Sequence, residues 1–130
     1  MDFSKQYGSL DPKQSAKWFE LDGSKFLIAP ANNIAFKNKT LETFKISQVQ
    51  NNGIDDLTAK TVVELESKIK VGTVLLDWES VQNQGQPYPF NEDNAVKMLV
   101  VYEQFRNWVD SKASELANTT SKIQDSKKKN

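Results

Sequence analysis

The fold is decided by residues 72–115, which read GTVLLDWESVQNQGQPYPFNEDNAVKMLVVYEQFRNWVDSKASE. An apolar run ends in Asp77-Trp78-Glu79, and a connection rich in Gly and Pro follows it. Asn91 then stands before a long amphipathic segment that has two acidic residues in its first turn. Asparagine is a preferred N-cap, and acidic side chains favour the positive end of the helix dipole. The sequence therefore predicts a long helix that begins directly after Asn91.

This predicted helix carries one sustained apolar face, because its apolar residues recur at spacings of three and four. The face consists of Ala95, Met98, Leu99, Tyr102, Phe105, Val109, Ala113 and Leu116. We expect its centre to be buried, namely Leu99, Tyr102, Phe105 and Val109. We expect the polar residues around this centre to be exposed, namely Lys97, Glu103, Gln104 and Asp110.

Three large aromatic residues in this stretch have alternative roles. Trp108 lies about 100° from Val109 around the helix, so it either packs at the edge of the core or anchors a partner. Trp78 has charged neighbours on both sides and belongs either to the core or to the lip of a groove. Phe90 precedes the Asn91 cap, which is the position of a hydrophobic staple residue that would pair with Ala95.

Residues 16–30 have the pattern of a β-hairpin. Asp22-Gly23 separates two short runs rich in aromatic and branched residues, and a two-residue type I′ turn there requires positive φ at both positions. This turn pairs Leu21 with Ser24, Glu20 with Lys25, Phe19 with Phe26 and Trp18 with Leu27. Because side chains alternate along a strand, one face of the hairpin then carries Phe19, Leu21, Phe26 and Ile28.

Two further helices are predicted between the hairpin and residue 72. Asn32 or Asn33 can cap the first, which runs to about residue 48. After a breaker cluster at residues 51–53, the second spans residues 57–69 and is closed by Gly72. Residues 74–81 suit either a strand or a helical turn. The expected inner stripe of the first helix is Ile34, Leu41 and Phe44 or Lys45, with Phe36 beside it; that of the second is Leu57, Val62, Leu65 and Ile69.

These elements predict a mainly α fold with a small N-terminal β-hairpin (α+β), in which three to four helices pack on the hairpin. Residues 16–118 form a single globular domain, with the hairpin at 16–30 and the helices within 32–118. Residues 1–15 are polar and aperiodic, which favours a flexible N-terminal arm. Residues 119–130 are polar and rich in Lys, so we expect a disordered tail.

Composition narrows the function. The 130 residues contain 17 Lys and Arg and 17 Asp and Glu, so the formal net charge is zero and nucleic acid is not an expected partner. No apolar run is long enough to span a bilayer, so we expect no membrane association and a cytosolic protein. His and Cys are absent, which removes the commonest general base, nucleophile systems and metal ligands. We therefore expect no enzyme, no catalytic residue, no cofactor and no metal; Asp77, Glu79, Glu92 and Asp93 are interpreted as solvated carboxylates.

The order of the motifs in residues 72–115 resembles the tail assembly chaperone family of long-tailed, siphovirus-type bacteriophages, and the resemblance extends over residues 18–117. It rests on the apolar run closed by Asp77-Trp78, the Gly-x-Pro-x-Pro-Phe connection that ends at Phe90, and two signals of the last helix. Those signals are Glu92-x-Asn94-Ala95 at its start and Phe105-Arg106-x-Trp108-Val109 about three turns further on. The family usually has Ser or Thr at the position of Asn91, and it favours a helix over residues 74–81.

The resemblance implies a non-enzymatic chaperone that binds and solubilises the tape measure protein in the host cytoplasm and is absent from the mature virion. It also implies a longer product made by programmed frameshifting, through which the major tail tube protein would be bound; the Lys run at residues 127–129 is compatible with a slippery A-rich codon stretch. Self-association is a further expectation. The candidate partner-binding residues are Trp108, Trp78, Phe105, Phe90 and Tyr102. The alternatives are a small structural tail or head completion protein, and a generic protein-interaction module.

Overall fold

The computed structural model describes residues 11–50 and 59–128. The predicted turn at 51–53, the start of the predicted second helix at Leu57 and most of the predicted N-terminal arm lie outside these ranges. The helical elements are the 3₁₀ helix η1 (Pro12–Ser15) and the α-helices α2 (Ile34–Gln50), α3 (Ala59–Lys70), α4 (Glu92–Val101) and α5 (Glu103–Lys128). The strands are β1 (Lys17–Leu21), β2 (Ser24–Ile28), β3 (Leu75–Glu79), β4 (Gln82–Asn83) and β5 (Gln86–Pro87).

The N-terminal hairpin forms in the predicted register. Strands β1 and β2 are antiparallel, with Phe19 opposite Phe26, and the other three predicted pairs are also present. The two turn residues have positive φ, 50° at Asp22 and 84° at Gly23. On the predicted inner face Phe26 is 4% exposed and Ile28 is fully buried. The local turn signal was therefore sufficient to fix the pairing of these strands.

Replacing Gly23 by valine is expected to lower the free energy of unfolding by about 1 kcal/mol or more, because a β-branched residue is strained at φ of 84°. A Cβ at this position would meet no atom within 4 Å, so backbone strain is the whole cost. Thermal unfolding measures it. Gly23→Asn is the matched control, since Asn tolerates positive φ and should lose less. An unchanged melting temperature in the valine variant would contradict the turn.

A third strand completes the sheet where the family resemblance favoured a helix. Strand β3 pairs antiparallel with β2, so the sheet order is β1-β2-β3, and Trp78 lies opposite Phe26. Of the two alternatives for residues 74–81 the strand is therefore confirmed, and the helix that the resemblance favoured is wrong. A short apolar run has no strong local preference. The free edge of β2 offers it backbone partners, and pairing there buries Leu75 and Trp78 against the core.

The connection after β3 folds back onto Trp78. Gln84 and Gly85 both have positive φ and form a tight turn between β4 and β5. The Trp78 Nε1–H donates to the Tyr88 carbonyl (2.7 Å), and the Tyr88 ring stacks on the indole at 5.9 Å. Trp78 is 5% exposed, so it belongs to the core and not to the lip of a groove. Its indole nitrogen has the hydrogen-bond partner that burial requires.

The last predicted helix is two helices. Asn91 caps α4 as predicted, because its Oδ1 accepts the Asn94 N–H at 2.8 Å. The chain then leaves the helical conformation at Tyr102 and resumes it as α5. Two of the burial predictions were wrong: Tyr102 is 48% exposed, and Asp110 is half-buried beside Lys70. The remaining predictions are confirmed, with Leu99, Phe105 and Val109 buried and Lys97, Glu103 and Gln104 exposed.

Helix α2 begins where predicted but turns a different face inward. Asn33 caps it by accepting the Phe36 N–H at 2.8 Å. Two members of the predicted stripe are wrong, since Ile34 and Leu41 are 53% and 71% exposed, whereas Phe44 is half-buried and Phe36 packs against the core cluster. Lys39 contributes to the inner side, where its Nζ donates to the Val71 carbonyl at 2.7 Å. Burial lowers the pKa of Lys39, and the carboxylate of Glu92 opposes this effect.

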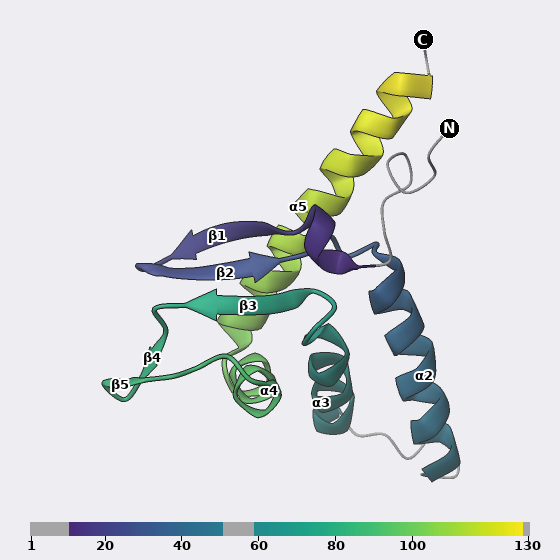
Figure 1. The fold of residues 1–130 in the computed structure, drawn as a ribbon. Coiled ribbons are helices and arrows are strands. Elements are labelled where there is room, and N and C mark those ends of the chain that lie inside the picture. Colours follow the sequence, from purple (N-terminus) through teal and green to yellow (C-terminus); the bar gives the residue numbers. More distant parts are fainter. Residues whose placement is uncertain (1–10, 51–58, 129–130) are drawn as a thin grey trace.

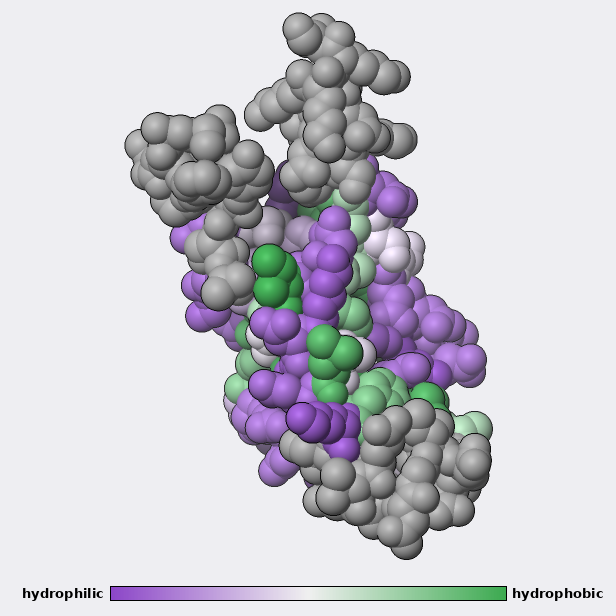
Figure 2. Space-filling view, turned by 90° about the vertical axis from the view of Figure 1, so that its right-hand side faces the viewer, coloured by the Kyte–Doolittle hydropathy of each residue, from purple (hydrophilic) through white to green (hydrophobic). Residues whose placement is uncertain are grey.

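The elements form two layers. In Figure 1, α5 crosses behind the three-stranded sheet, α4 is seen end-on beside β3, and α3 and α2 lie next to each other on the right. The side occupied by α2 is shown in Figure 2, where hydrophobic groups form separate spots in a mostly hydrophilic surface.

The predicted α+β class with an N-terminal hairpin is confirmed. Helix α5 is described as far as Lys128, past residue 119, where we predicted a disordered tail. The predicted domain limits stay a prediction.

Candidate functional site

The candidate site is built on the break between α4 and α5. Tyr102 has φ −105° and ψ 92°, which is outside the helical region, and no Pro or Gly is present to cause the break. The sequence there is Val100-Val101-Tyr102, and β-branched and aromatic residues are weak helix formers. The Tyr102 N–H still donates to the Met98 carbonyl at 3.1 Å, so α4 ends with a closed turn.

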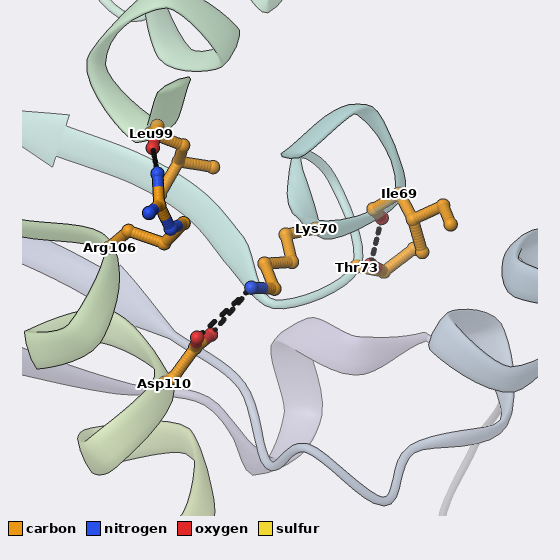
Figure 3. A network of polar contacts seen from close by, with 6 residues as sticks. All are labelled: Ile69, Lys70, Thr73, Leu99, Arg106 and Asp110. Carbon is orange, nitrogen blue, oxygen red and sulfur yellow. Dashed lines mark hydrogen bonds and ion pairs between the residues drawn. The ribbon is translucent and has the colours of Figure 1, made fainter. Parts of the chain in front are cut away.

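Arg106 fixes the geometry of the break. From the first turn of α5 its Nη1 donates to the carbonyl of Leu99 at 2.8 Å (Figure 3). The same Nη1 also donates to the carbonyl of Val100 at 3.3 Å. The last carbonyls of a helix have no partner within the helix, so this guanidinium both satisfies them and complements the negative end of the α4 dipole. The break is therefore held in place by a side chain from the second helix.

The break leaves apolar side chains at the surface. Val101 is 66% exposed and Tyr102 is 48% exposed, although both are large apolar or aromatic residues. Together with residues from the hairpin tip and α5 they line an open hollow of about 710 Å³. We call this the aromatic hollow, and its lining residues are Leu21, Asp22, Val101, Tyr102, Glu103, Gln104, Phe105 and Trp108.

Three of the five predicted partner-binding residues meet in the aromatic hollow: Tyr102, Phe105 and Trp108. Tyr102 is the most exposed of the three. Phe105 is 8% exposed and forms part of the floor. Trp78 and Phe90 are not in the hollow; Trp78 lies in the core, and the Phe90 ring packs edge-on against it with centroids 5.0 Å apart.

The side chain of Trp108 is more buried than that of an exposed anchor residue would be. It is half-buried, and its ring lies 5.5 Å from that of Phe26, 6.3 Å from Phe105 and 6.5 Å from Phe19, measured between centroids. Of the two predicted alternatives for Trp108, packing at the edge of the core is therefore the one that the structure has. Its indole is a wall of the hollow and also part of the aromatic cluster that joins α5 to the hairpin.

Sequence reasoning missed five members of the site, which are Leu21, Asp22, Val101, Glu103 and Gln104. The run Val100-Val101 was an available signal, since it widened the apolar surface beyond one helical stripe. Leu21 and Asp22 are far from the break in the sequence, and only the packing of the hairpin on α5 brings them there. A local pattern holds no information on that contact.

A second hollow of about 340 Å³ lies between α2, α3 and α5. Its apolar lining includes Phe36, Phe44, Ile69 and Ala113. At its edge the Lys70 ammonium lies 2.9 Å from Asp110 Oδ1 and ties α3 to α5 (Figure 3). Lys70 and Asp110 on its wall are thus paired within the chain, and its volume is about half that of the aromatic hollow.

The acidic residues that could be considered as metal ligands or as acid/base groups lie where they stabilise the local backbone. The Asp77 Oδ1 accepts the backbone N–H of Trp78 at 2.8 Å, and Glu92 and Asp93 lie in the first turn of α4. Within residues 11–50 and 59–128, no three side chains of His, Cys, Asp or Glu are grouped as metal ligands would be. No helix in this part of the chain has both the length and the apolar character needed to cross a membrane.

Fold and hollow together define a small α+β protein with an apolar surface beside a helix break. Comparison with known families adds its origin: residues 28–130 match the family model described as YdaY prophage protein. The chain belongs to this prophage protein family and is therefore of bacteriophage origin. No curated protein and no solved structure matches the chain.

Proposed function

We propose that this prophage protein is a non-enzymatic tail assembly chaperone that binds and solubilises the tape measure protein in the host cytoplasm before the tail tube polymerises. The observation that carries the proposal is the aromatic hollow, where Val101 and Tyr102 stand exposed beside Phe105 and Trp108. The bacteriophage origin of the family and the motif order in residues 72–115 support it.

The physical case concerns the partner. A long amphipathic helix that waits for tube subunits exposes an apolar stripe and tends to aggregate. A hollow with aromatic walls can take the apolar side chains of such a helix, as grooves in other helix-binding domains do. Tube subunits must later displace the chaperone, so each contact is weak and many copies act together along the partner. A frameshifted longer product would recruit the major tail tube protein to the same complex.

Co-expression tests the proposal directly. The wild-type chain is expected to raise the soluble yield of the tape measure protein from the same prophage and to copurify with it in several copies. Tyr102→Ala should weaken the complex about tenfold or more, because a half-exposed aromatic residue in a binding hollow is a typical hot spot. The amount of copurified partner and the dissociation constant by titration are the measurements.

Leu41→Ala is the matched control, because Leu41 is 71% exposed on α2 and does not line the hollow. It should bind like the wild type. If the wild-type chain neither solubilises nor copurifies with the tape measure protein, the chaperone function is wrong. The chaperone should also be missing from purified virions, and its presence there by mass spectrometry would favour a structural tail or head completion protein instead.

A further inference from the structure

The charges around the aromatic hollow have one sign. Asp22 and Glu103 line it, and none of the lining residues is basic. Neither carboxylate forms an ion pair with another residue in the described ranges. The whole chain carries equal numbers of acidic and basic residues, so this local excess of negative charge is not a consequence of composition. The lining therefore lacks the positive charge that would complement it.

The basic residues near the aromatic hollow either interact with other groups of the chain or do not line the hollow. Lys25 lies opposite Glu20 and Glu79 in the register of the sheet and is not a lining residue. Arg106 donates to the carbonyls at the end of α4. Lys97 lies on α4 about one turn before its end and is not a lining residue. The hairpin tip and the start of α5 thus present uncompensated negative charge beside apolar groups.

The aromatic residues that line the hollow also favour a cationic ligand. The faces of tyrosine and tryptophan attract ammonium and guanidinium groups, and the attraction strengthens as the cation loses water. Tyr102 and Trp108 line the hollow together with the carboxylate residues Asp22 and Glu103. A cationic side chain with a long apolar stem can satisfy both, because its stem lies on apolar surface while its charge reaches the rim.

We propose that the aromatic hollow receives an amphipathic segment of the tape measure protein in which Lys or Arg flanks the apolar residues, with the cation placed between Asp22 and Glu103. This inference rests on the proposed function and specifies the chemistry of the partner segment. The apolar residues of that segment would contact Val101 and Tyr102. Its positive charge would determine the position along the hollow at which the segment binds.

The test uses fluorescein-labelled peptides that tile the tape measure protein of the same prophage, measured by fluorescence anisotropy at several salt concentrations. The peptides bound by the full-length wild-type chain should carry Lys or Arg, and replacing those residues by Gln should weaken binding. Asp22→Asn and Glu103→Gln should each weaken binding about two- to fivefold and flatten its salt dependence. Asn suits the positive φ of position 22, so the turn is kept.

Glu42→Gln is the matched control, since Glu42 is an exposed carboxylate on α2 outside the hollow, and it should leave both the affinity and its salt dependence unchanged. Thermal unfolding of each variant verifies that the fold is kept. If the bound peptides lack basic residues, or if Asp22→Asn and Glu103→Gln bind like the wild type, the inference is overturned while copurification still upholds the chaperone function. If the whole tape measure protein does not copurify, both fail.

Discussion

Trp78→Ala is expected to lower the free energy of unfolding by about 3–5 kcal/mol, the usual cost of truncating a buried large aromatic residue. The indole is 5% exposed and packs against the rings of Phe26, Tyr88 and Phe90. Truncation would leave a cavity at the junction of the sheet and the loop before α4, and it would remove the hydrogen bond to the Tyr88 carbonyl. Small domains are stable by about 5–15 kcal/mol, so this loss is a large fraction of the total and should lower the unfolding temperature clearly.

Urea denaturation of Trp78→Ala and Trp78→Phe separates packing from hydrogen bonding. Phenylalanine keeps most of the ring contacts and lacks the Nε1–H, so its loss should be about 1–2 kcal/mol. A loss below about 1 kcal/mol in the alanine variant would place Trp78 at the surface and return it to the set of partner-binding residues.

Phe105→Ala is the second large effect, with an expected loss of about 3–5 kcal/mol. Phe105 is 8% exposed, and its ring lies 5.0 Å from that of Phe26, so it joins α5 to the inner face of the hairpin. Tyr102→Ala is the informative comparison. In one continuous helix the two residues would share a face and cost similar amounts, since they are three positions apart.

Because the helix breaks at Tyr102, we expect Phe105→Ala and Tyr102→Ala to lower the free energy of unfolding by unequal amounts. Tyr102 is 48% exposed, so its truncation should change the free energy of unfolding by less than about 1 kcal/mol. Denaturation curves of the two variants, recorded under the same conditions, give the difference. Equal losses would indicate that the helix continues through position 102 and that the aromatic hollow does not exist in solution.

Local signals in the sequence predicted several elements correctly. Asp22-Gly23 fixed the hairpin and its register, because few residue pairs accept positive φ at two consecutive positions. Asn33 and Asn91 fixed the starts of α2 and α4, because their side chains supply the acceptor that a helix N-terminus lacks. In each case the cause and the effect lie within a few residues of each other.

For the candidate site the sequence supplied the residues but not their arrangement. Tyr102, Phe105 and Trp108 were all predicted partner-binding residues, and they do line one hollow. Their exposure was predicted from an uninterrupted helix, which placed Tyr102 inside, whereas Tyr102 is 48% exposed; for Trp108 the sequence left the core edge and a partner anchor as alternatives, and it is half-buried. The break turns Tyr102 out of the apolar stripe while Phe105 and Val109 stay buried as predicted, and periodicity alone contains no sign of such a break.

The sequence by itself determined the α+β class, the hairpin register and the helix caps, because turns and caps are satisfied by neighbouring residues. The tertiary structure decided the rest. Strand β3 exists because the edge of β2 supplies hydrogen-bond partners to a run with no strong preference of its own. The inner face of α2 is set by its packing on α3 and the core, where Phe36 is half-buried, whereas Leu41 is 71% exposed. The hollow arises where Arg106 holds α4 and α5 at their break and the hairpin tip packs beside it, a contact between segments about eighty residues apart.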